Sequence, residues 1–138
     1  MRIPKKYIVV IGLSITAMIG VAAIEPGKPT TGAFKNLQVL PADITSKQLN
    51  KIMVDEFEDD LGVTCNFCHA ENKETHKPDY ASDEKPEKEI ARAMMRMTIG
   101  INEQYFELNH PMIGDSALTI SCNTCHNGQP HPEGAGTK

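Results

Sequence analysis

Two copies of one short pattern contain all four cysteines of this 138-residue chain, and a histidine closes each copy. The copies read VTCNFCH from Val63 to His69 and ISCNTCH from Ile120 to His126. One helical turn places the two thiols of a CxxCH motif where they can bond to both vinyl groups of a porphyrin, and the next imidazole can reach the iron. We therefore expect two covalently bound c-type haems, with these attachment residues and proximal ligands: Cys65, Cys68 and His69 for the first haem, and Cys122, Cys125 and His126 for the second.

Two other uses of the cysteines explain the pattern less well. A disulfide inside CxxC closes a loop of two residues and constrains little, although disulfides are the default in an oxidising compartment. Zinc bound by two CxxC pairs does not account for the histidine after each pair. The chain is also poor in large apolar groups, with 5% aromatic residues and no Trp. Two porphyrins would supply the apolar surface that such a core lacks.

The N-terminal 24 residues have the pattern of a targeting or anchoring segment. Three basic residues lie within the first six positions, and Ile8 to Ile24 then runs 17 residues without a charge. This length falls between a signal-peptide core and the shortest membrane-spanning helix. Cleavage near Val21–Ala23 and retention as an N-terminal membrane anchor both remain open. In either case residues from Glu25 onward are expected on the periplasmic side of a bacterial inner membrane, attached to it or released.

The predicted fold is mainly α, with two helix–turn–CxxCH units packed around two haems and little or no sheet. We divide the chain into a signal peptide or anchor (1–24), a linker (25–35), a dihaem domain (36–130) and a flexible tail (131–138).

A first amphipathic helix is expected directly before the first motif. Residues 45–61 open with a Thr or Ser cap, and Gly62 ends the segment. Apolar residues recur there at helical spacing, and Met53 is one of them, 12 residues before Cys65. A hairpin of helix, turn and CxxCH would bring Met53 across the first haem as the sixth iron ligand, although an apolar Met on such a face is more often part of a core.

A second helix is expected to begin near Ser82 and Asp83, with Pro86 in its first turn. One stripe of this helix holds apolar side chains spaced by 4, 3, 4 and 4 residues, namely Ile90, Met94, Met97, Ile101 and Tyr105. Met94 and Met97 are therefore candidates for the sixth ligand of the second iron, and spacing alone does not separate them. Met95 lies on a different face of this helix and is a weaker alternative for the sixth ligand.

Three further histidines compete as distal ligands. His76 lies in a polar stretch, His110 precedes Pro111 in a connector, and His131 follows a turn near the C-terminus. Such residues are usually exposed, and His110 is the strongest of the three because its connector returns towards the second motif.

Three stretches resemble the cytochrome c subunit family of photosynthetic reaction centres. They read FKNLQVLPADITSKQLNKIM, ASDEKPEKEIARAMMRMTIGIN and TCHNGQP, and the resemblance spans Phe34 to Pro130. It implies a Met-bearing helix before each CxxCH, with Met53 serving the first haem and Met94 the second. The family's subunits hold four haems, whereas this chain has two motifs, so the resemblance does not imply docking to a reaction centre.

The predicted function is electron transfer by a dihaem carrier and not enzymatic catalysis, because two His/Met-ligated irons leave no site for a substrate. The alternative is a peroxidase-like enzyme or gas sensor with one open iron. A third hypothesis is that the protein serves as a fixed subunit of a respiratory membrane complex.

Charge narrows the class of partner. Beyond Ile24 the chain has 11 basic and 18 acidic side chains, a net charge of −7, which argues against nucleic acid. Part of this charge is concentrated before the first motif, at Asp55, Glu56, Glu58, Asp59 and Asp60. Such a cluster is usually a solvated helix face, and the alternative is a docking patch for a basic redox protein.

Overall fold

The computed structural model describes residues 34–132 of the chain. The predicted signal peptide or anchor (1–24) lies outside the described residues, as do most of the predicted linker (25–35) and most of the predicted tail (131–138).

The described residues are mostly helical. In chain order the elements are α2 (Ser46–Ile52), η1 (Met53–Asp59), α3 (Cys65–Cys68), β1 (Ala70–Glu71), β2 (Pro78–Asp79), α4 (Pro86–Phe106) and α5 (Cys122–His126). The strands β1 and β2 form one short antiparallel ladder, which pairs Ala70 with Asp79 and Glu71 with Pro78. The prediction of a mainly α fold with little sheet is therefore confirmed.

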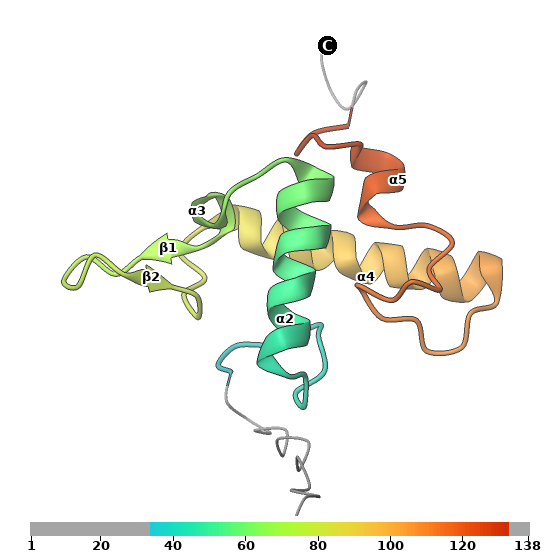
Figure 1. Cartoon of the computed structure of the whole chain (residues 1–138), viewed down its shortest axis with the longest axis horizontal. Coiled ribbons are helices and arrows are strands. Elements are labelled where there is room, and N and C mark those ends of the chain that lie inside the picture. The colour runs from blue at the N-terminus through green and yellow to red at the C-terminus, as the bar shows by residue number, and fades with distance from the viewer. Residues whose placement is uncertain (1–33, 133–138) are drawn as a thin grey trace, which may run out of the picture.

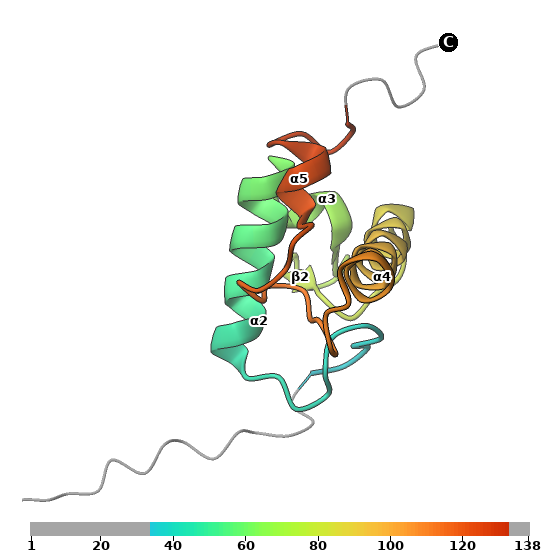
Figure 2. The same ribbon diagram turned by 90° about the vertical axis from the view of Figure 1, so that its right-hand side faces the viewer.

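The helix formed by α2 and η1 crosses α4, with α3 and the strands beside one end of α4 and α5 nearer the other (Figure 1). A view from the side separates these two long helices into two layers, with α5 against the first (Figure 2). Between residues 34 and 132 no helix is both long enough and apolar enough to cross a membrane.

The first predicted helix forms, but it changes its hydrogen bonding midway. Thr45 is its N-cap, and a capping box joins Thr45 to Gln48. From Met53 to Asp59 the helix is a π-helix, whose wider turn is shown by the Asp60 N–H bonding to the Asp55 carbonyl five residues back. Gly62, with a φ of 65°, ends the helical segment as predicted.

The second predicted helix forms as α4, with Pro86 at its first turn, and it ends at Glu107 in the left-handed conformation. Its buried face differs from the predicted apolar stripe. Ile90 and Tyr105 of that stripe are 57% and 75% exposed. The buried positions of α4 are Lys88, Arg92, Met95, Thr98 and Asn102.

Polar side chains are buried on α4 because loop groups satisfy them. Lys88 donates to the carbonyls of Tyr80 and Ser82, and Arg92 donates to the carbonyl of Asn36. These partners lie in other segments of the chain, so the apolar periodicity of α4 gave no sign of them.

The hydrophobic core is small, as the composition predicted. Its buried cluster joins the segment before α2, α2 itself, α4 and the connection after α4, through Leu40, Ile44, Ile52, Met95 and Ile113. Ile113 is the most enclosed of them, with no exposed surface.

Candidate functional site

The first CxxCH motif lines a cavity of about 630 Å³ that also contains Met53. Cys65, Cys68 and His69 lie on the walls of this cavity, and so does Met95 of α4. The volume falls within the range of cofactor pockets in proteins. Met53 and the first motif are thus brought to one site, as the sequence predicted.

Local structure presents the first motif as a single helical turn. The helix α3 consists of the four residues CNFC, and the His69 N–H bonds to the Cys65 carbonyl at 3.0 Å. This turn follows the three residues that separate it from the end of the first helix at Leu61. All four cysteines of the chain are free thiols in the structure.

The surroundings of the His69 imidazole favour its neutral form. Burial lowers its pKa below the usual value, and the positive charge of Lys88 adds to this effect. Its ring packs edge-on against Tyr80, with 5.1 Å between the ring centroids. Within the described residues, its Nδ1 atom is buried and has no hydrogen-bond partner. Neutral imidazole is the form that binds iron, so His69 fits the proximal role.

A charged network closes the cavity on the side of α4. Arg92 pairs with Asp83 and with Glu89, each at 3.0 Å. The Asn36 amide donates a hydrogen bond to Asp83 at 2.8 Å. This hydrogen bond has the largest effect on the pKa of the Asp83 carboxyl, and together with the one from Arg92 it holds that pKa far below its usual range. Lys88 and Arg92 both line the cavity. They are cations that suit the two propionates of a haem.

The second CxxCH motif is also a helical turn, α5. Ser121 caps it through a capping box with Thr124. The Nδ1 atom of His126 lies 2.9 Å from the Gln129 carbonyl oxygen, to which it donates a hydrogen bond. That bond fixes the tautomer and leaves Nε2 free as a ligand atom. The second histidine is thereby oriented as a haem ligand requires.

The end of the first helix holds the second motif in place. The Asp60 carboxylate accepts the Asn123 N–H at 3.1 Å, and the Asp60 carbonyl accepts the Gly128 N–H at 2.8 Å. Glu56 lies against Cys122, and its Oε2 atom is buried without a hydrogen-bond partner among residues 34–132. Burial raises the pKa of the Glu56 carboxyl, while burial and the Glu56 charge raise the pKa of the Cys122 thiol to about 12.

These contacts change the interpretation of the acidic cluster. Asp60 and Glu56 bind the second motif, Glu58 lines the first cavity, and Asp55 pairs with Lys51 at 2.5 Å. Of the five acidic residues, Asp59 is exposed and the other four are partly buried. The cluster was expected to be a solvated helix face, and the structure shows that four of its five residues are instead partly buried.

The methionines of α4 separate into two groups. Met95 is 6% exposed and lines the first cavity, so it is turned away from the face that carries Met94 and Met97. Met94 and Met97 are 41% and 49% exposed. Neither of them lines the cavity of the first motif.

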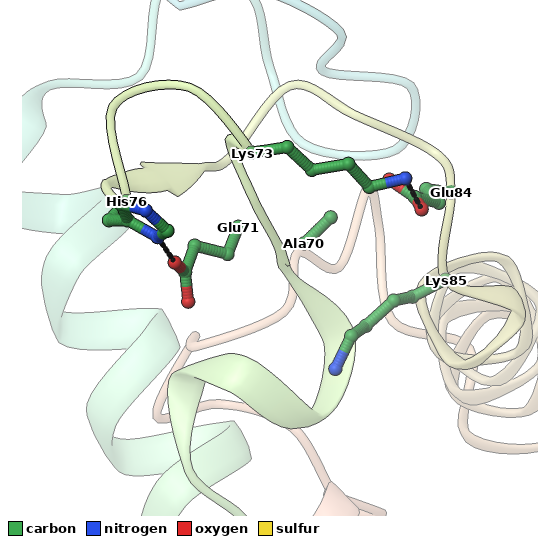
Figure 3. Close-up of a pocket in the computed structure, with 6 residues that line it drawn as sticks. All are labelled: Ala70, Glu71, Lys73, His76, Glu84 and Lys85. Atoms are coloured by element: carbon green, nitrogen blue, oxygen red, sulfur yellow. Dashed lines mark hydrogen bonds and ion pairs between the residues drawn. The ribbon is translucent and has the colours of Figure 1, made fainter.

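The remaining histidines are exposed. His76 points at Glu71, 2.7 Å away, in a polar pocket of about 470 Å³ beside the two strands, where Lys73 pairs with Glu84 (Figure 3). His110 lies in the connection after α4, with a φ of 51°, and His131 lies close to the end of the described residues. None of the three lines the cavity of the first motif.

Asn102 and Asn36 support the site, and sequence reasoning did not single them out. Asn102 is fully buried within α4, and Asn36 has a φ of 67°. Asn inside a helix is unfavourable because its side chain competes for backbone groups. The presence of Asn102 inside a predicted helix, in the run IGIN, was the sequence feature that could have indicated its role.

Comparison with known proteins gives one family. Residues 13–137 match the model of the photosynthetic reaction centre cytochrome C subunit. Cytochrome c-554 of Chloroflexus aurantiacus is 35% identical over 96 residues, which are 70% of this chain and 21% of that protein. The photosynthetic reaction center cytochrome c subunit of Rubrivivax gelatinosus is 36% identical over 50% of this chain and 15% of its own length. That of Roseobacter denitrificans is 31% identical over 72% of this chain and 25% of its own length. The chain therefore spans a quarter or less of the length of these relatives.

Proposed function

This chain belongs to the photosynthetic reaction centre cytochrome c subunit family, and we propose that it is a dihaem c-type cytochrome that transfers electrons between redox partners. The observation that carries the proposal is the first cavity, where Met53, Cys65, Cys68 and His69 line one space. Two thiols can attach a haem covalently, and an imidazole and a thioether can complete the coordination of a six-coordinate iron. A bound haem supplies a one-electron iron couple.

In the first site the chain's own residues hold and shield the cofactor. Cys65 and Cys68 would attach the haem covalently, and His69 and Met53 would ligate its iron, which would leave no coordination site for a substrate. Arg92 and Lys88, which already pair with Asp83, would supply positive charge for the propionates at the wall of the cavity. As a ligand, the thioether of Met53 would favour the ferrous iron and raise the reduction potential relative to a second imidazole.

In the second site we assign attachment to Cys122 and Cys125, and proximal ligation to His126. The exposed stripe of α4 supports Met94 as the sixth ligand, with Met97 as the alternative on the same face. The burial of Met95 in the first cavity disfavours it as a ligand of the second iron. A porphyrin against this stripe would cover apolar side chains that are otherwise open to water.

The proposed setting is the periplasmic side of the inner membrane. This rests on the basic and apolar pattern of residues 1–24, either as a retained anchor or as a cleaved signal. Redox proteins are the proposed partners, either in free exchange or within a respiratory membrane complex. The acidic balance of the chain favours a partner with a basic surface.

One observation favours a second candidate function. Because the side chains of Met94 and Met97 are 41% and 49% exposed, the second iron could lack a thioether ligand and remain open to a small molecule. That arrangement would support a peroxidase-like or gas-binding role at the second haem, while the first haem remained an electron carrier.

Magnetic circular dichroism of the oxidised, haem-loaded protein tests both candidates. Two six-coordinate irons are expected to give the sulfur-to-iron charge-transfer band with no high-spin signal. The variants Met53→Leu and Met94→Leu should each remove about half of that band, since each deletes one of the two proposed thioether ligands.

Met112→Leu is the matched control, because Met112 lies outside the first cavity and outside α4. A high-spin component in the unmodified protein would instead favour the open-iron function. If Met94→Leu keeps the full sulfur-to-iron band and Met97→Leu does not, Met97 would be the sixth ligand of the second iron.

A further inference from the structure

Asn102 is a fully buried polar side chain that binds the segment leading into the second CxxCH motif. It lies in α4, four residues before the end of that helix, and has no exposed surface. The connection that leaves α4 returns past this helix before it enters α5 (Figures 1 and 2). A buried amide needs a complete set of hydrogen bonds, because an unpaired one is costly.

The side chain of Asn102 uses its whole hydrogen-bonding capacity. Its Oδ1 atom accepts the N–H groups of Thr119 and Ile120 at 2.9 and 3.1 Å. Its Nδ2 atom donates to the carbonyls of Ile120 and Thr98 at 2.8 and 2.9 Å. Two acceptor sites and two donor hydrogens are all that an amide offers.

Only an amide of this length fits such a set of partners. Aspartate lacks the donor, leucine lacks both functions, and glutamine adds a methylene in a position with no free space. Three of the four partners belong to the backbone at Thr119 and Ile120, so the interaction does not depend on the side chains there.

The fixed peptide lies immediately before the second motif. Ile120 is followed by Ser121, the N-cap of α5, and then by Cys122. Asp60 binds Asn123 from the first helix, so the motif is held by both long helices. We infer that Asn102 is a positioning residue for the second haem, which fixes the entry of the chain into CNTCH and thereby the placement of Cys122, Cys125 and His126.

The inference rests on the proposed second haem, and amide hydrogen exchange of the haem-loaded full chain tests the contact separately. Thr119 and Ile120 lie outside the helices and strands, yet their amides are expected to be protected in the unmodified protein. Fast exchange at both amides would overturn the inference.

Asn102→Leu should accelerate exchange at Thr119 and Ile120 by about tenfold, the change that one ordinary hydrogen bond supports. It should also shift the reduction potential of the second haem and weaken its sulfur-to-iron band, with the first haem unchanged. Asn102→Asp keeps the acceptor and should lose less protection than Asn102→Leu. If Asn102→Leu folds poorly, amide exchange at Thr119 and Ile120 in Asn102→Asp and in the unmodified protein still tests the inference.

Ile113→Ala is the control for general loss of stability, because Ile113 is equally enclosed but belongs to the hydrophobic cluster. A shift of the second haem that is as large in Ile113→Ala as in Asn102→Leu would overturn the inference. Peptide mass mapping of the unmodified protein separates the two proposals. Absence of haem at Cys122 and Cys125 would contradict the dihaem function, whereas the exchange result would still stand on its own.

Discussion

Gly62 and Gly100 show how differently single residues constrain this chain. Gly62 has a φ of 65°, and a Cβ atom there would meet the Gly128 carbonyl oxygen at 2.3 Å. This close approach joins the end of the first helix to the end of the second motif. Gly100 lies within α4, and a Cβ atom there would meet nothing within 4 Å.

Gly62→Ala is therefore expected to destabilise the protein by roughly 1–3 kcal/mol, through left-handed strain and the clash with Gly128. Gly100→Ala should stabilise it by about 0.4–1 kcal/mol, because alanine restricts the unfolded chain in a helix-compatible position. Denaturant unfolding of the two variants measures both effects, and equal midpoints would contradict the close approach.

Asp83 is expected to make the free energy of unfolding depend on pH. Hydrogen bonds from Asn36 and Arg92 lower the pKa of Asp83 in the folded protein relative to 3.8. A carboxyl with a lowered folded pKa stabilises above its unfolded value and loses that contribution as pH falls.

Asp83→Asn should therefore reduce stability at neutral pH, and the difference from the unmodified protein should shrink as the pH falls below 3.8. Unfolding midpoints at neutral and acidic pH measure this change. Asp59→Asn, at an exposed position, is the control. A difference that grows in acid would contradict the proposed network.

At the scale of elements, the first helix serves both motifs. Its π-helical part begins with Met53 at the first cavity and is followed by Asp60, which binds Asn123 of α5. A π-helical turn shifts the angular position of the residues beyond it, and such turns are frequent at functional sites. The helix thereby connects the two sites physically.

Asp60→Ala should lower the free energy of unfolding by about 1.5–3 kcal/mol, the range for a hydrogen bond to a charged group. It should also speed amide exchange at Asn123, its partner at 3.1 Å. Asp59→Ala, one residue earlier, should change neither quantity appreciably. Unchanged exchange at Asn123 in Asp60→Ala would show that the contact does not hold α5.

Across the whole molecule, few apolar side chains are available to stabilise the fold. In the described part of the chain, seven hydrophobic residues are buried, while the first motif faces a cavity of about 630 Å³. Small domains have a net stability of only about 5–15 kcal/mol, so a cofactor that fills such a cavity contributes a large share.

The double variant Cys65→Ser/Cys68→Ser is therefore expected to lose the first haem and most of its cooperative thermal unfolding transition. Circular dichroism during heating measures this loss. Cys122→Ser/Cys125→Ser is the matched comparison and should be milder, because the hydrophobic cluster packs around the first cavity. A first-motif variant as stable as the unmodified protein would contradict haem-dependent folding.

The amino-acid sequence by itself determined the features that are local along the chain. Two CxxCH turns, the cap at Thr45 and the stop at Gly62 each depend on neighbouring residues, and the structure has them all. The second helix was expected to begin near Ser82 and Asp83, whereas α4 begins at Pro86, which lies in its first turn as predicted. Met53 was also predicted correctly to lie with the first motif, because a short hairpin leaves few other arrangements.

Tertiary structure alone decided which face of α4 is buried and how the second motif is held. Lys88, Arg92 and Asn102 are buried because carbonyl, amide and carboxylate groups from distant segments satisfy them. Hydrophobic periodicity depends only on the polarity of each residue, so it cannot show whether distant segments will supply hydrogen-bond partners. It therefore identified the apolar stripe of α4 but could not show that much of this stripe would remain exposed.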